Sequence, residues 1–95
     1  MKRLYHCSAY YDGNGLVSYN TRVITIERVQ DGTKVTLYNY RSITTLSHIR
    51  KYITLLESKG NYELAYRVRK LYEVAGKYKS SRYIINGTDN RITVL

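Results

Sequence analysis

Residues 22–40 read RVITIERVQDGTKVTLYNY, and this stretch decides the fold. Apolar and polar side chains alternate on both sides of Asp31–Gly32, as they do in two half-buried strands joined by a tight turn. A two-residue loop at Asp31–Gly32 pairs Val29 with Lys34. In this register one face of the hairpin collects the apolar side chains Ile24, Ile26, Val35 and Leu37. The stretch therefore predicts an antiparallel hairpin with one buried face.

Further strands are expected on both sides of this hairpin. The turn-forming residues DGNG at Asp12–Gly15 precede it, and a second turn is expected around Gly87–Asn90 near the end of the chain. In the closing hairpin Ile85 is expected to lie opposite Ile92. The additional strands are expected over residues 4–11, 16–29, 83–86 and 91–95, with 16–29 forming the first arm of the central hairpin.

Between the two groups of strands the apolar spacing changes to steps of three and four, which is typical of helices that bury one stripe. The first helix is expected to have Ser42, Thr44 or Thr45 as its N-terminal cap and to end at Gly60. The second is expected to begin at Asn61, so a two-residue link makes the pair antiparallel. The buried stripes are Leu46, Ile49, Ile53 and Leu56 in the first helix, and Leu64, Val68, Leu71, Ala75 and Tyr78 in the second.

The predicted fold is a single α+β domain over residues 1–95, with the element order β-β-β-α-α-β-β. Its sheet is antiparallel, and the helical hairpin packs on one face of that sheet. A winged helix is the alternative, because a helix, a short turn, a basic helix and a hairpin at 83–95 follow one another in that order.

The composition is unusual in its aromatic residues and its charge. The chain of 95 residues contains twelve tyrosines but no Phe, Trp or Pro, and its formal net charge is +9. Tyrosine must therefore supply aromatic packing in the core and aromatic contacts at the surface. Ten of the 16 basic residues fall in 41–82, where only three acidic residues oppose them. A concentrated basic surface favours polyanions or acidic protein faces as partners.

Cys7 is the only cysteine, so an intramolecular disulfide is impossible and a reducing compartment fits the chain. The start MKR is like the basic region of a signal peptide, but LYHCSAYYDG supplies no sustained apolar run after it. No stretch approaches the length of a membrane span. We therefore expect a cytoplasmic protein without a membrane partner.

Few residues are available for catalysis. His6 and Cys7 are neighbours on an expected strand, so their side chains point to opposite faces and do not pair as base and nucleophile. The chain lacks the ligand spacing of a metal site, and DGNG matches a hairpin turn better than a phosphate-binding loop. His48 is the best proton carrier for an assembled site. We expect no catalytic residue, no metal and no cofactor.

The second helix and the loop after it carry basic side chains with tyrosines between them. Such a surface can contact phosphates with its cations and stack its aromatic rings on bases. The expected binding residues are Tyr66, Arg67, Arg69, Lys70, Lys77, Tyr78, Lys79 and Arg82. The alternative is a solvated helix face that is partly neutralised by Glu73.

We therefore expect a non-catalytic protein that binds nucleic acid or a nucleic-acid-handling complex. The alternative is a protein–protein inhibitor that anchors exposed tyrosines on an acidic protein partner. Composition does not separate these functions, because Tyr and Arg serve both kinds of interface. An exposed sheet edge can also pair two copies of the chain into a homodimer.

Two short motifs resemble those of a known family. Ser18–Thr21 reads SYNT, and Tyr40–Ile49 follows the pattern Tyr-x-Ser-x-Thr-Thr-x-x-His-Ile. In these motifs the chain resembles a family of small tailed-bacteriophage proteins, over roughly residues 16–53. The resemblance implies a phage origin and a role inside the infected host, where such proteins bind host or defence components in the manner of anti-CRISPR proteins. It implies no catalytic residues.

The polar positions of the two motifs are expected to form one hydrogen-bonded cluster that organises the scaffold. Thr45 and His48 are three residues apart and share a helical face. Asn20 or Thr21 is expected to lie within reach of His48. The expected cluster comprises Asn20, Thr21, Thr44, Thr45 and His48.

Overall fold

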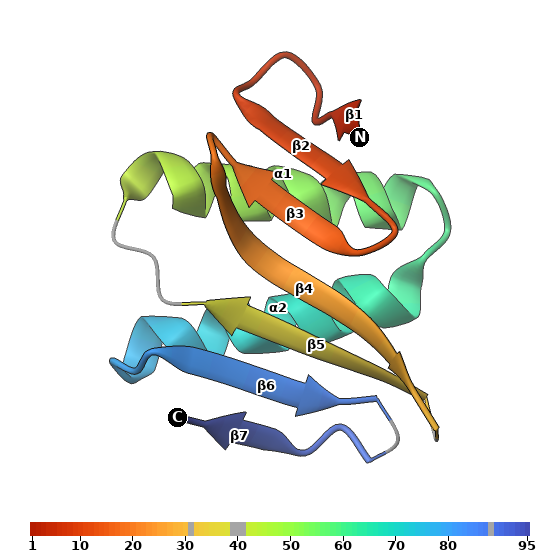
Figure 1. Ribbon diagram of the computed structural model, residues 1–95, viewed down its shortest axis with the longest axis vertical. Helices are drawn as coiled ribbons and strands as arrows, with labels where there is room; N and C mark the ends of the chain where they lie inside the picture. The colour runs from red at the N-terminus through yellow and green to blue at the C-terminus, as the bar shows by residue number, and fades with distance from the viewer. Residues whose placement is uncertain (31, 39–41, 88) are drawn as a thin grey trace.

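The computed structural model describes residues 1–30, 32–38, 42–87 and 89–95. In these residues seven strands form one antiparallel sheet in the order of the chain, and two helices lie between the fifth and sixth strands (Figure 1). The elements are β1 (Lys2–Arg3), β2 (Ala9–Asp12), β3 (Gly15–Ser18), β4 (Thr21–Val29), β5 (Gly32–Tyr38), α1 (Ile43–Ser58), α2 (Tyr62–Lys77), β6 (Arg82–Asn86) and β7 (Ile92–Val94). The α+β class with a helical hairpin on an antiparallel sheet is confirmed.

Both helices cover the same face of the sheet and run antiparallel to each other (Figure 1). α1 packs against β3, whereas α2 packs against β5 and β6. The largest fully buried side chains lie between the two layers and are Tyr52, Leu4, Leu16, Ile24, Leu37, Ile49, Leu71, Ile85, Val35 and Val68. Because both helices lie on a sheet that β6 and β7 extend, the chain is not a winged helix.

The prediction of a single long strand over residues 16–29 is wrong. The chain reverses at Tyr19–Asn20, so that β3 and β4 pair with each other and Ser18 lies opposite Thr21. Tyr19 adopts a φ of 55° to make the reversal. Apolar residues occur at a strand-like spacing on both sides of this turn, and only Asn20 is a typical turn former, so the sequence gives little sign of it.

The strand expected over 4–11 is shorter than predicted. Of the residues in this span only Ala9–Tyr11, which belong to β2, pair with β3. The backbone from Leu4 to Ala9 forms a loop closed by a hydrogen bond from Leu4 N to Ala9 O (2.8 Å). Tyr5 adopts a φ of 49° in this loop. Leu4 is nevertheless fully buried, so its apolar side chain anchors the loop to the core.

The central hairpin forms, but its register differs from the predicted one by two residues. Val29 pairs with Gly32 instead of Lys34, so Gly32 belongs to β5 and not to the turn. Asp31 lies outside the described residues. A shift of two residues leaves every side chain on its face, because strand side chains alternate with a period of two. The predicted apolar face therefore survives, with Ile24 opposite Leu37 against the helices.

The other two predicted hairpin turns are confirmed. Asp12 pairs with Gly15 at the end of the β2–β3 hairpin, and the Asp12 carboxylate accepts a hydrogen bond from Asn14 N at 2.8 Å. In the closing hairpin Ile85 lies opposite Ile92, as predicted.

The helices begin and end close to the expected residues. Ser42 is the N-terminal cap of α1, and its hydroxyl accepts hydrogen bonds from the backbone N–H groups of Thr44 (3.2 Å) and Thr45 (3.4 Å). Gly60 ends the hairpin turn in the left-handed region, with a φ of 77°. Tyr78 does not extend the buried stripe of α2: it follows the last helical residue and is 61% exposed.

Candidate functional site

The two sequence motifs meet at the contact between β3 and the first turns of α1. Ser18 Oγ lies 2.8 Å from His48 Nδ1 and 3.0 Å from Thr45 Oγ1, and all three side chains are buried. The single hydroxyl proton of Ser18 serves one partner, so its oxygen accepts from the other. The Tyr19 ring lies over this cluster, with its centroid 5.5 Å from that of the His48 ring. The cluster therefore ties a strand to a helix.

The membership of this cluster differs from the expected one. Thr45 and His48 belong to it, but Asn20, Thr21 and Thr44 are exposed. Ser18 takes the place expected for Asn20 or Thr21 because its side chain lies on the same sheet face as Leu16, toward the helices. Asn20 lies in the reversal between β3 and β4 instead.

Burial sets the protonation state of His48. Its side chain is 3% exposed, and desolvation, reinforced by the positive charge of Lys51, lowers its pKa below the ordinary value of 6.5. The imidazole is therefore neutral at neutral pH. Ser18 is equally inaccessible, and Tyr19 packs over the ring. This serine–histidine pair has the contact distance of a nucleophile and its base, but both side chains are buried.

The expected binding residues of α2 divide into one buried side chain and a set of surface side chains. Arg67 is 8% exposed and points inward, where its guanidinium binds Glu63 Oε1 (2.6 Å) and Gly87 O (2.9 Å). It also donates to Asn90 Oδ1 at 3.4 Å. Arg67 therefore holds the β6–β7 hairpin against α2 and is not presented to a partner.

The remaining expected residues form what we call the basic surface: Tyr66, Arg69, Lys70, Lys77, Tyr78, Lys79 and Arg82. Arg69 is ion-paired with Glu57 of α1 at 3.0 Å. Lys70 Nζ lies 5.4 Å from the centroid of the Tyr66 ring, in a cation–π contact. Among the described residues, no ion pair engages Lys77, Lys79 or Arg82. Tyr62 was missed by the sequence reasoning, yet at 68% exposure it extends this surface by one helical turn.

The loop that carries Tyr78 and Lys79 is held by hydrogen bonds on both sides. The buried Tyr83 side chain donates its hydroxyl to Tyr78 O and accepts from Ser80 N at 2.9 Å. Ser81 N donates to Leu95 O at 2.8 Å. The cations at the end of α2 are therefore displayed from a fixed backbone.

Other kinds of site are not found in the described part of the chain. No group of three or more His, Cys, Asp or Glu side chains is arranged there to hold a metal ion. None of its helices combines the length and the apolar character needed to cross a membrane. Comparisons with protein-family models, with curated proteins and with solved structures find no match.

Proposed function

We propose that the protein binds nucleic acid through the basic surface, with a preference for single strands. The observation that carries the proposal is the display of cations beside exposed tyrosine rings on and just after one helix. Tyr66 is 48% and Tyr78 61% exposed, and Lys77, Lys79 and Arg82 extend the positive charge beyond them. Cations neutralise phosphates, and aromatic rings stack on unpaired bases, which are accessible only in single strands.

The formal net charge of +9 supports the same function, because it raises the rate of encounter with any polyanion. A cytoplasmic setting and a phage origin, as the SYNT and TTLSHI motifs imply, form part of the proposal. In that setting the protein acts by occupying nucleic acid, without chemistry of its own.

Fluorescence anisotropy with a labelled oligo-dT strand and a duplex of the same length tests this function. We expect tighter binding to the single strand and a loss of affinity between about 50 mM and about 200 mM salt, because phosphate contacts release counterions. Affinity that does not change with salt would refute the proposal.

A triple variant locates the contact. Lys77→Ala, Lys79→Ala and Arg82→Ala together remove three cations of the basic surface, and we expect the slope of log affinity against log salt to become shallower by about 2. The matched control, Lys2→Ala with Arg28→Ala and Arg91→Ala, removes the same charge from exposed positions elsewhere. Equal losses in the two triple variants would place the binding outside the basic surface.

A second candidate function, inhibition of an acidic host or defence protein, is favoured by the row of exposed rings. Tyr62, Tyr66 and Tyr78 offer large rigid contact areas of the kind that dominate protein interfaces. Affinity purification with and without nuclease treatment separates the two functions. A stoichiometric protein that remains bound after nuclease treatment supports inhibition, and loss of all bound material supports nucleic-acid binding.

A further inference from the structure

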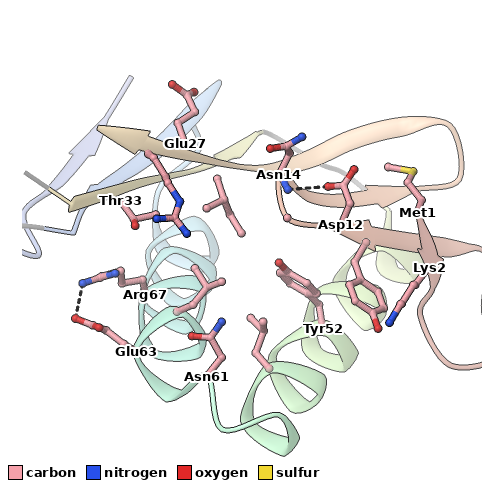
Figure 2. Close-up of a pocket in the computed structure, with 16 residues that line it drawn as sticks. Met1, Lys2, Asp12, Asn14, Glu27, Thr33, Tyr52, Asn61, Glu63 and Arg67 are labelled. Atoms are coloured by element: carbon pink, nitrogen blue, oxygen red, sulfur yellow. Dashed lines mark hydrogen bonds and ion pairs between the residues drawn. The ribbon is translucent and has the colours of Figure 1, made fainter. Parts of the chain in front are cut away.

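A groove of about 940 Å³ opens between the sheet and the helices, where α1 passes into α2. The β2–β3 turn, the β4–β5 hairpin, the C-terminal half of α1 and the first turns of α2 surround it (Figure 2). Its apolar lining is formed by Tyr11, Ile26, Tyr52, Leu56 and Leu64. This volume falls in the range of small-molecule sites, and the groove is separate from the basic surface, most of which lies at the opposite end of α2.

The Tyr52 side chain carries the strongest indication of a ligand. Its ring is buried to 1% exposure, and its hydroxyl points into the groove (Figure 2). Among the described residues, none accepts a hydrogen bond from this hydroxyl or donates one to it. No described side-chain oxygen or nitrogen that is cut off from solvent lacks a partner, so this hydroxyl is reached by water through the groove, and a ligand that accepts its hydrogen bond can replace that water. Burial, with the negative charge of Asp12, raises the pKa of Tyr52 to about 12, so the proton to be donated is retained.

The charges around the groove favour an anion. Each carboxylate that lines it is already ion-paired with a cation of the protein: Asp12 with Arg22, Glu27 with Lys34 and Glu63 with Arg67. The lining cations Lys2 and Arg28, by contrast, form no ion pair within the described chain. The paired carboxylates therefore leave a surplus of positive charge at the rim.

The start of α2 adds to this preference. Asn61 lines the groove and is the N-terminal cap position of a 16-residue helix, but its side chain makes no capping hydrogen bond. The positive end of the helix dipole thus lies at the groove, and Glu63, the acidic side chain of the first turn, is ion-paired with Arg67. Tyr52, the rim cations and this helix end all favour a ligand group that accepts hydrogen bonds and carries negative charge.

We propose that the groove binds a small amphipathic anion, with its apolar part on the Ile26, Leu56 and Leu64 side chains and its oxyanion hydrogen-bonded to Tyr52. The expected ligand carries a carboxylate or a phosphate on an apolar or planar body. A neutral apolar molecule leaves the rim cations uncompensated, and a cation is repelled by them.

Binding of anilinonaphthalene sulfonate, whose fluorescence rises in an apolar site, tests the proposal with the full chain. We expect one site, from which decanoate displaces the dye more effectively than decanol, its neutral analogue. Adenosine monophosphate is tested as a second competitor for the dye. Displacement of the dye by adenosine monophosphate identifies a ligand with a phosphate on a planar body, and displacement by decanoate identifies an alkyl carboxylate. Displacement by neither anion, or equal displacement by decanol, would overturn the proposal.

Tyr52→Phe and Arg28→Gln place the ligand in the groove. Because a hydrogen bond to a charged group is lost, we expect Tyr52→Phe to weaken binding about tenfold or more. Arg28→Gln should weaken it by a smaller, salt-sensitive factor. Tyr10→Phe, on the face of β2 opposite to Tyr11, is the matched control and should leave affinity unchanged. Unchanged affinity in Tyr52→Phe refutes the site.

A thermal melt of Tyr52→Phe distinguishes a loss of ligand binding from a loss of folded protein. Removing a hydroxyl that has no partner in the protein should leave the melting temperature of the free chain unchanged or slightly higher. A clear fall in melting temperature would show that the hydroxyl already has a structural partner, and this outcome would also overturn the proposal.

Discussion

Ser18 Oγ lies 2.8 Å from His48 Nδ1, and this contact joins residues 30 positions apart in the chain. It fixes the start of α1 against β3, with Thr45 as the third member of the buried cluster. Because polar groups in a water-excluded site depend on one another, the cluster is a structural joint whose removal has a measurable cost.

Ser18→Ala should destabilise the protein by about 1 to 3 kcal/mol, because it leaves His48 and Thr45 buried without their shared partner. Urea unfolding measures the loss. Thr44→Ala is the control: Thr44 belongs to the same sequence motif but is exposed, so its change should stay within about 0.5 kcal/mol. Similar losses in both variants would show that the Ser18 contact does not stabilise the fold.

Stability should fall as the pH drops below about 6.5, with His48 as the cause. The pKa of His48 in the folded protein is lowered from 6.5 by burial, so the unfolded chain binds the proton more readily. Between the folded and unfolded pKa values, protonation therefore favours unfolding, and the stabilisation present above the unfolded value is lost on acidification.

Urea unfolding at about pH 7.5 and about pH 5 measures this dependence. His48→Gln should be less stable at the higher pH and should show a flatter profile. If His48→Gln were as pH-sensitive as the wild type over this interval, another group would be responsible.

Arg67→Ala should lower stability by about 2 to 3 kcal/mol, because it frees the Gly87 carbonyl and leaves a gap between α2 and the β6–β7 hairpin. Arg69→Ala is the matched control two residues along the helix. Arg69 is half-exposed and its ion pair with Glu57 lies at the surface, so its loss should cost no more than about 1 kcal/mol. A larger loss of stability in Arg69→Ala than in Arg67→Ala would contradict the structural role of Arg67.

Gly15→Ala should be among the most damaging single changes, costing at least about 3 kcal/mol. A Cβ at Gly15 would lie 1.9 Å from Ile24 O, and the φ of 130° is one that residues with side chains rarely adopt. Gly13→Ala, in the same turn, has nothing within 4 Å of the added Cβ and should be nearly neutral. Thermal melts compare the two variants, and near-equal melting temperatures would contradict the β2–β3 geometry.

Much of the fold was predictable because its signals are local. The period-two alternation around residues 22–40 gave the central hairpin and its buried face, and the apolar stripes gave both helices. The reversal at Tyr19–Asn20 was missed because the strand-like spacing of apolar residues occurs on both of its sides. The apolar alternation also did not reveal the two-residue error in register, because a shift of two residues moves no side chain to the other face.

The residues of the candidate site were predictable only in part. The basic surface follows from composition and helical spacing, and all of its expected members except Arg67 lie partly or fully exposed. Arg67 lies three residues after Leu64 and four before Leu71, at the edge of the buried stripe, whereas Arg69 lies three after the exposed Tyr66, so helical spacing could have separated the two. The contact with Gly87 then shows that Arg67 is structural. The sequence also did not show whether Ser18 or Asn20 contacts His48, because this depends on which strand face each side chain lies on.

The sequence by itself determined the α+β class, the charge and the spacing of the helices, because these depend on residue type and on contacts a few positions apart. Only the tertiary structure decided which polar side chains meet. It joined Ser18 to His48, turned Arg67 inward, and aimed Tyr52 into a groove formed by four separate segments. Such contacts depend on strand reversals and helix packing that bring distant residues together, and no local pattern records them.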